Sequence, residues 1–214
     1  MCRKLLGKLH KASRYRKFQL FMENVNPGPN DRVLDVGVEA IRNNEFSNLF
    51  ETLYPYPKNL IALSYLDPEA VKDFYPGVRF VCGDGRRLPF LDKSFDIAVS
   101  NAVLEHVGNT ADQASFVREM CRVAHKVFIT TPNRHFPVEL HSRLPFVQYM
   151  PRPIRNWMLA RAGRQYMIPL WGESFNLLSK RQFRALFPSD VRVRIIGQRV
   201  TLLAETLIAI VSDE

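Results

Sequence analysis

Small and polar residues follow four successive apolar segments of the chain, at the point where each segment ends. Glycine lets a backbone approach a ligand closely, and carboxylates accept hydrogen bonds from amino and hydroxyl groups. One Asp or Gly after a strand is ordinary turn chemistry, but four such ends in succession indicate a pocket for a nucleoside-like ligand. The four groups are Asp35-Val36-Gly37-Val38-Glu39, Ser64-Tyr65, Gly83-Asp84-Gly85 and Ser100-Asn101-Ala102.

Three histidines are candidates for acid–base catalysis. His106 comes shortly after the fourth of these segments, and His135 and His141 follow a fifth apolar segment. An unperturbed imidazole titrates near neutral pH, so each could accept a proton from a substrate hydroxyl. A structural hydrogen-bonding role stays open for each. Glu139 and His141 are close in sequence, but no third ligand follows at a clear spacing, so the sequence predicts no metal site.

The three cysteines carry no chemical signal. Cys2, Cys82 and Cys121 lack the spacing of a zinc site or a redox pair. We expect free thiols, with Cys82 and Cys121 buried as small hydrophobic side chains.

Apolar segments alternate with helical patterns along the chain. This alternation predicts an α/β fold: a doubly wound, mostly parallel seven-stranded sheet (Rossmann-like) with an antiparallel C-terminal edge strand. In such a sheet, ligands bind beyond the carboxyl ends of the strands, where the strand order reverses. The predicted strands are residues 32–38, 59–64, 78–82, 95–100, 126–131, 191–197 and 202–211, and the predicted helices are 43–54, one starting at Asp67-Pro68, 110–123 and 179–187.

We expect a single domain over residues 1–214 with two additions to the sheet. Residues 1–26 have the apolar spacing of an amphipathic helix. Residues 132–190 are rich in proline, aromatic residues and arginine, and follow the fifth strand as an insert that we expect to form a lid over the acceptor site. The lid aromatics are Trp157, Tyr166, Trp171 and Phe175.

The chain is basic, with a formal net charge of +9. This excess favours an anionic partner, with general solubility as the alternative. No RNA-recognition motif is present, so nucleic acid is disfavoured as a partner. No apolar run is long enough to span a membrane and no signal peptide is evident, so we expect a cytoplasmic protein. The basic N-terminal helix could bind an anionic membrane surface peripherally or pack over the site.

Residues 32–131 resemble the class I S-adenosylmethionine-dependent methyltransferases, in particular the small methyltransferase-domain group. Val33-Leu34-Asp35-Val36-Gly37 is similar to their first motif. Residues 83–90, ending in Leu88-Pro89-Phe90, are similar to the motif that follows the third strand. The segment from Ser94 to His106 is the closest match, to the motif on and after the fourth strand. The resemblance implies S-adenosylmethionine as cofactor and methyl transfer by in-line displacement, which requires no nucleophilic residue.

The resemblance also implies roles for individual residues. Gly37 would let the loop pass under the methionine moiety, and Asp84 would hold the adenine amino group with the Gly85 amide nearby. Asn101 and Ala102 would line the cofactor near its sulfonium. Leu104, Glu105 and His106 would border the acceptor pocket, unless Glu105 and His106 instead cap or orient the next helix.

Two positions depart from the family pattern. Glu39 stands where the family has a second glycine, and it could crowd the methionine moiety or bind its ammonium group. Tyr65 stands where an acid usually binds the ribose, which would leave Ser64, Tyr65 or a shifted Asp67 for that task. The main expectation is methyl transfer to a small, anionic acceptor, free or linked to a lipid or sugar. The alternative is a non-catalytic binding or scaffold protein on the same fold.

Overall fold

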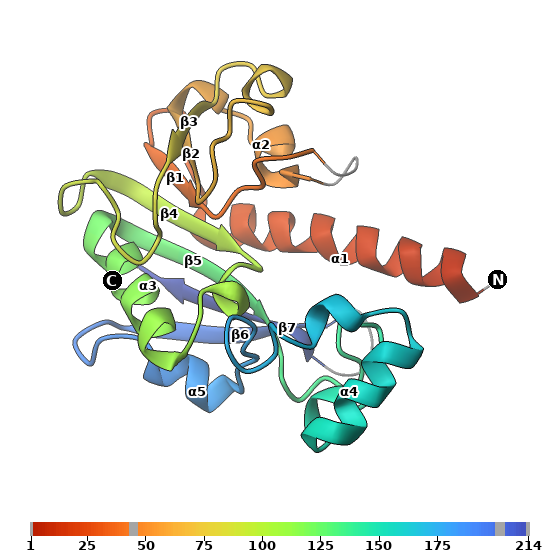
Figure 1. The fold of residues 1–214 in the computed structure, drawn as a ribbon. Helices are drawn as coiled ribbons and strands as arrows, with labels where there is room; N and C mark the ends of the chain where they lie inside the picture. Colours follow the sequence, from red (N-terminus) through yellow and green to blue (C-terminus); the bar gives the residue numbers. More distant parts are fainter. Residues whose placement is uncertain (1, 43–46, 200–203, 213–214) are drawn as a thin grey trace.

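The computed structural model describes residues 2–42, 47–199 and 204–212, and their strands form one seven-stranded sheet (Figure 1). The strand order is β3-β2-β1-β4-β5-β7-β6, and β7 runs antiparallel to both of its neighbours. The predicted mostly parallel sheet with an antiparallel C-terminal edge is therefore confirmed. The strands are β1 (Val33–Val36), β2 (Leu60–Ser64), β3 (Arg79–Cys82), β4 (Phe95–Asn101), β5 (Ala124–Pro132), β6 (Val193–Arg199) and β7 (Ala204–Val211).

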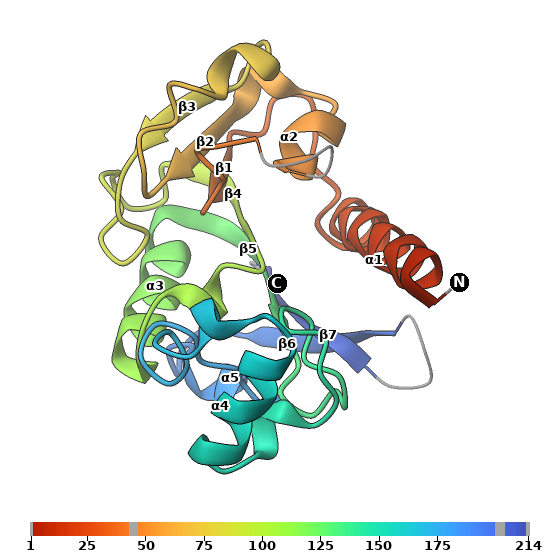
Figure 2. The ribbon, with the colours of Figure 1, turned by 45° about the vertical axis from the view of Figure 1, so that its right-hand side comes forward.

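Helices cover both faces of the sheet, as Figure 2 shows with α1 and α3 on opposite sides. Within the described part of the chain, no helix combines the length and apolar character that a membrane crossing needs. The α-helices are α1 (Cys2–Val25), α2 (Leu49–Leu53), α3 (Thr110–Val123), α4 (Arg152–Arg161) and α5 (Lys180–Ala185), and the short 3-10 helices are η1 (Pro57–Asn59), η2 (Lys72–Phe74), η3 (Leu104–His106), η4 (Val147–Tyr149) and η5 (Gln165–Met167).

Alternation along the strands divides the core into two layers. Leu34 and Val36 of β1 point to the layer under α3 and α5, where Phe116 and Phe183 are buried. Val33 points to the opposite layer, beneath α1 and α2. The aromatic rings of that second layer include Phe18, Phe21, Phe50, Tyr54 and Phe128, several of them in edge-to-face contact. The last two turns of α1 thus pack on the sheet as part of the core.

Side-chain capping boxes begin two of the α-helices, α3 and α5. At α3, the Asn109 side chain accepts hydrogen bonds from the second and third backbone amides, and Asp112 bonds back to the Asn109 amide. Ser179 and Gln182 form the same reciprocal pair at α5. Asn109 therefore caps α3, and the alternative that Glu105 or His106 caps this helix is wrong.

Three local predictions are wrong. Of the predicted helix over residues 43–54, the structure has only α2, and residues 43–46 lie outside the described part. Asn48 precedes α2 in the left-handed conformation (φ 52°) and bonds to the Glu39 backbone, so α2 begins at Leu49. No α-helix follows Asp67-Pro68: only η2 forms there, and Phe74 is exposed while Val71 and Tyr75 are buried. Cys82 is exposed, while Cys121 is buried as expected.

Of the predicted insert over residues 132–190, α5 packs on the main core, and the part before it has an apolar cluster of its own. Val147, Leu159, Met167 and Phe175 make a small apolar cluster of their own. This cluster holds α4, which the sequence analysis did not predict, with Pro153 in its first turn. Trp157 and Tyr166 are 65% and 61% exposed, so neither packs inward as a lid residue.

Candidate active site

Two adjoining cavities lie at the carboxyl ends of the central strands, where β1 pairs with both β2 and β4. The Asp84 cavity has a volume of about 660 Å³ and is lined by residues that include Ser64, Tyr65, Asp84, Gly85 and Phe116. The Asn101 cavity has a volume of about 540 Å³ and is lined by residues that include Arg14, Lys17, Asp35, Glu51, Asn101, Ala102, His106 and His141. Both volumes lie within the range of small-molecule sites. The two cavities share Gly37, Val38, Glu39, Val103 and His106.

Gly37 marks the point where the two cavities meet. Its φ is +102°, and its amide donates to the Leu63 carbonyl at 2.8 Å. A Cβ on Gly37 would lie 2.4 Å from a methyl carbon of Val103. Both the backbone conformation and the close contact require glycine here. Gly85 is also tightly packed, since a Cβ there would lie 2.5 Å from the Phe116 ring.

Asp84 presents an ionised carboxylate beside the Asp84 cavity. The Arg86 guanidinium binds it at 2.7 Å, and the Arg86 amide donates to the same carboxylate at 2.9 Å. These hydrogen bonds with Arg86 hold the pKa of Asp84 below its usual value. Arg86 also reaches Asp112 at 3.3 Å. A carboxylate has two oxygens that can each accept more than one hydrogen bond, so Asp84 could bind the Arg86 guanidinium and a ligand amino group together.

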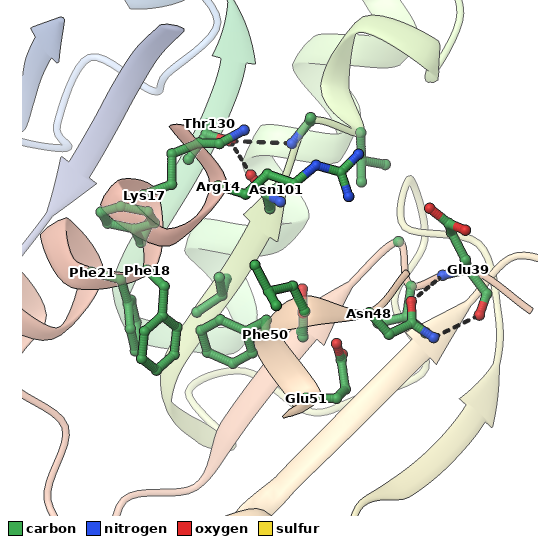
Figure 3. A pocket seen from close by; sticks show the side chains of 18 of the residues that line it. Arg14, Lys17, Phe18, Phe21, Glu39, Asn48, Phe50, Glu51, Asn101 and Thr130 are labelled. Carbon is green, nitrogen blue, oxygen red and sulfur yellow. Dashed lines mark hydrogen bonds between the residues drawn. The ribbon is translucent and has the colours of Figure 1, made fainter. Parts of the chain in front are cut away.

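Neither residue that departs from the family pattern closes the Asp84 cavity. Tyr65 is 68% exposed and forms part of the rim. Glu39 is also exposed, and its carboxylate accepts a hydrogen bond from the Ser47 hydroxyl at 2.8 Å, while its backbone is bonded to Asn48 (Figure 3). Ser64 is buried at the end of β2. The shifted Asp67 lines neither cavity and is exposed.

A buried pair of acids forms one wall of the Asn101 cavity. Asp35 and Glu51 are each 5% exposed and are hydrogen-bonded to each other. Burial raises the pKa of Glu51 to about 7, and burial together with the charge of Glu51 raises that of Asp35 well above its usual value. The pair therefore keeps a bound proton at pH values at which two exposed carboxyl groups would both be ionised. Glu51 Oε1 has no hydrogen-bond partner among the described residues.

The turn after β4 positions Asn101 and Ala102 on the opposite wall of this cavity. The Thr130 hydroxyl donates to Asn101 Oδ1 at 2.8 Å and accepts from the Ala102 amide at 3.2 Å (Figure 3). The Ala102 amide also donates to the Thr130 carbonyl at 3.0 Å. Ala102 has a φ of +57°, a conformation that costs an ordinary residue about 1 kcal/mol or more. That turn places Val103 against Gly37.

The C-terminal half of α1 contributes positive charge to the Asn101 cavity. Arg14 and Lys17 both line it, together with the rings of Phe18 and Phe21 (Figure 3). Burial lowers the pKa of Lys17 to about 8, which still leaves the ammonium mostly protonated at pH 7. Among its described residues, α1 therefore forms one side of the Asn101 cavity.

Two of the three candidate histidines come together. His106 Nε2 and His141 Nε2 are 3.2 Å apart, and Phe175 packs against both imidazoles. His141 Nδ1 lies 2.9 Å from a carboxylate oxygen of Glu139. Desolvation, followed by the charge of His141, lowers the pKa of His106 to about 4. Desolvation is the largest single influence on the pKa of His141 and lowers it, but the hydrogen bond with Glu139 and the charges of Glu105 and Glu139 together outweigh it, so the net pKa is raised.

His135 is separate from this pair. It is exposed, lines neither cavity, and its Nδ1 lies 3.2 Å from the Tyr149 hydroxyl. The structure therefore brings His106 and His141 to the candidate site and leaves His135 outside it. Sequence reasoning did not single out Glu51 or Thr130, and nothing in their local spacing distinguishes them from other polar residues of a helix or strand.

Comparison of the sequence and the fold with known proteins points to methyltransferases. The sequence model of a family described as methyltransferase domain matches residues 50–127, a segment that starts after β1 and the Glu39 loop. No curated protein matches the chain in sequence. Among solved structures, the PH0226 protein from Pyrococcus horikoshii OT3 is similar with a TM-score of 0.60 and 18% identity, over 95% of this chain and 91% of that protein.

Two further solved structures are methyltransferases crystallised with S-adenosyl-L-homocysteine. The geranyl diphosphate C-methyltransferase of Streptomyces coelicolor A3(2), also with Mg²⁺ and geranyl diphosphate, has a TM-score of 0.59 and 10% identity, over 98% of this chain and 81% of that one. The N-methyltransferase NodS of Bradyrhizobium japonicum WM9 has a TM-score of 0.55 and 15% identity, over 94% and 87%. The chain therefore has the fold of the class I S-adenosylmethionine-dependent methyltransferases and contains, at residues 50–127, a match to their methyltransferase domain family.

Proposed function

We propose that this protein transfers a methyl group from S-adenosylmethionine to a small, anionic acceptor. The observation that supports this most is the pair of cavities that meet at Gly37, one beside the ionised Asp84 and the other between Asn101 and α1. A nucleoside and an acceptor would occupy neighbouring spaces along the strand ends. The sulfonium of S-adenosylmethionine supplies an activated methyl group, so the protein's task is mainly positioning, which can provide about 7–11 kcal/mol of the barrier.

The residues present fit the nucleoside part of this ligand. The Asp84 cavity is open, and its lining combines the apolar Phe116 with the acceptor oxygens of Asp84 and the buried Ser64. Asp84 would accept a hydrogen bond from the adenine amino group. In the absence of an acid at the end of β2, Ser64 and Tyr65 are the residues that would contact the ribose.

The Asn101 cavity offers both signs of charge. Glu51, with its unpartnered buried oxygen, would receive the ammonium of the methionine moiety. Arg14 and Lys17 line the side formed by α1 and would attract a carboxylate or phosphate on the acceptor. Asn101 and Ala102 would then lie between the two ligands, where the methyl group is transferred.

Calorimetric titration with S-adenosylhomocysteine tests the cofactor half of this proposal. We expect saturable binding that Asp84→Asn weakens by at least about tenfold, the equivalent of 1.4 kcal/mol. Asp67→Asn is the matched control, because Asp67 follows the neighbouring strand but lines neither cavity. No binding at millimolar ligand would refute the proposal, and equal weakening by both variants would refute the role of Asp84.

Screening for the acceptor tests the other half. With S-adenosylhomocysteine bound, carboxylates and phosphates that fit the Asn101 cavity should raise the melting temperature of the wild type. Lys17→Gln should reduce that shift, while Arg16→Gln should not, because the exposed Arg16 is paired with Glu23 and lines neither cavity. Stabilisation by neutral compounds alone would contradict the anionic acceptor.

The alternative of a non-catalytic protein on this fold rests on Glu39 and Tyr65. Since neither side chain fills the Asp84 cavity, the structure gives no support to a blocked cofactor site. Incubation with methyl-labelled S-adenosylmethionine and a candidate acceptor separates the two readings. Tight cofactor binding with no turnover across the compounds that stabilise the protein would favour the non-catalytic reading.

A further inference from the structure

Three possible metal-ligand atoms converge at the edge of the Asn101 cavity. Glu105 and His106 belong to η3 after β4, and His141 comes from the segment after β5. One carboxylate oxygen and one ring nitrogen from each histidine all lie within 4.8 Å of one another. The two Nε2 atoms are 3.2 Å apart, and His141 Nε2 is 4.0 Å from Glu105 Oε1.

This spacing suits a first-row divalent metal. Two ligands on a tetrahedral ion with bonds of about 2.0–2.1 Å lie about 3.3 Å apart. The two imidazole nitrogens already have that separation, and a small rotation of the Glu105 carboxylate would complete the set. Two imidazoles and one carboxylate are the ligand type found at zinc sites that keep one position open.

Glu105 provides an independent indication of a cation. It is fully buried; its Oε2 accepts a hydrogen bond from the Thr131 hydroxyl at 3.2 Å, while its Oε1 has no hydrogen-bond partner among the described residues. Lys17 acts on Glu105 only through its charge. A buried polar atom left unpaired is unfavourable, and more so when it is charged. A metal ion bound at Oε1 would remove this cost.

His141 is held as a metal-binding histidine usually is. Its Nδ1 faces Glu139 Oε1 at 2.9 Å, and the backbone amides of His141 and Ser142 donate to the same carboxylate. With the proton on Nδ1, the lone pair of Nε2 points toward His106 and Glu105. Metal-ligating histidines commonly donate their second ring N–H to a carboxylate, which fixes the tautomer and the ring orientation.

We propose that Glu105, His106 and His141 bind one divalent transition-metal ion, with Zn²⁺ as the best fit and Glu139 as the residue that orients His141. Three protein ligands leave a coordination position open. Both imidazoles line the Asn101 cavity, so the open position would face that space. If the proposed function is correct, an oxygen of the acceptor would occupy it and lose its proton more readily near the metal.

Zinc titration of the full chain, stripped with a chelator and free of S-adenosylmethionine, tests the site directly. We expect saturation at about one ion per chain, with a rise in melting temperature that grows with ion concentration. Co²⁺ in place of Zn²⁺ should give visible absorption bands of a low-coordinate site. His141→Gln and Glu105→Gln should weaken binding by at least about tenfold, and Glu139→Gln by about 10–100-fold.

His125→Gln is the matched control, because His125 lies at the opposite end of β5 and lines neither cavity. Glu105→Gln keeps the shape and the bond to Thr131, and circular dichroism verifies that each variant is folded. Absence of saturable binding, or binding unchanged in folded His141→Gln and Glu105→Gln, would overturn the proposal. Methyl transfer that survives complete chelation but is lost in His141→Gln would refute a role of the metal in the reaction, and would assign the pair to acid–base catalysis.

The two proposals fail separately. Zinc binding is measured without the cofactor, and S-adenosylhomocysteine binding is measured on the metal-free chain. A chain that binds zinc but not S-adenosylhomocysteine would refute the proposed methyl transfer and leave the metal site standing, and the reverse result would refute only the metal site.

Discussion

Replacing Gly37 with alanine should destabilise the protein for two separable reasons. Its φ of +102° is unfavourable for any residue with a Cβ, at a cost of about 1–2 kcal/mol. The new methyl carbon would also lie 2.4 Å from Val103, and such overpacking typically costs about 1–3 kcal/mol. Together these give an expected loss of about 2–5 kcal/mol in the free energy of unfolding.

Gly163→Ala isolates the backbone part. Gly163 follows α4 with a φ of +69°, and an added Cβ would meet nothing within 4 Å. We expect a loss of about 1 kcal/mol for this variant. Val103→Ala removes the clashing methyls, at a packing cost of about 1–2 kcal/mol. The double variant Gly37→Ala/Val103→Ala should therefore lose less free energy of unfolding than the two single variants lose in sum, by about 1–3 kcal/mol.

Urea denaturation of the four variants measures these differences, and titration with S-adenosylhomocysteine shows whether the shared wall of the two cavities matters for binding. We expect Gly37→Ala to weaken binding and Gly163→Ala to leave it unchanged. The reasoning is refuted if Gly37→Ala costs no more than Gly163→Ala, or if the Gly37 and Val103 changes are simply additive.

The remaining predictions concern the buried acids, a helix cap and α1. The pKa of Glu51 is raised from 4.5 to about 7, so the folded state holds extra protons over that range and the free energy of unfolding falls as pH rises from about 4.5 to about 7. Glu51→Gln should flatten that fall, and a pH profile identical to wild type would contradict the buried pair. Asn109→Ala should cost about 1 kcal/mol in urea denaturation, and no change would refute the capping box. Phe21→Ala should cost about 3–5 kcal/mol because the ring is 1% exposed, whereas a cost under about 1 kcal/mol would show that α1 does not pack on the sheet in solution.

The architecture was largely predictable because it depends on local patterns. Short apolar runs bounded by polar, glycine or proline residues predicted all seven strands within about two residues, the usual uncertainty of element boundaries. The α3 helix matches its prediction at Thr110–Val123. Two predicted helices were wrong for different reasons. At Asn48 a contact with the Glu39 backbone overrides the local helix preference, and after Asp67 the connection between β2 and β3 buries few apolar side chains.

The site was only partly predictable, because its members meet through the fold. Gly37, Asp84 and Asn101 could be found from their positions at strand ends. Glu51 could not, since its pairing with Asp35 depends on how α2 packs on the sheet.

The histidine pair shows the same limit. His106 and His141 were predicted as separate candidates, each with a structural alternative. Their contact at 3.2 Å and the unpartnered oxygen of Glu105 arise from the approach of two segments that are 35 residues apart. No spacing rule for metal ligands covers such an arrangement, which explains why the sequence predicted no metal site.

A crystal structure of the chain with S-adenosylhomocysteine tests the central claim most directly. The adenine ring should lie in the Asp84 cavity with its amino group at Asp84, and the sulfur should lie at the junction by Gly37, facing Asn101. A saturated crystal in which the Asp84 cavity is empty, or in which the nucleoside binds away from the ends of β1 to β4, would contradict the account.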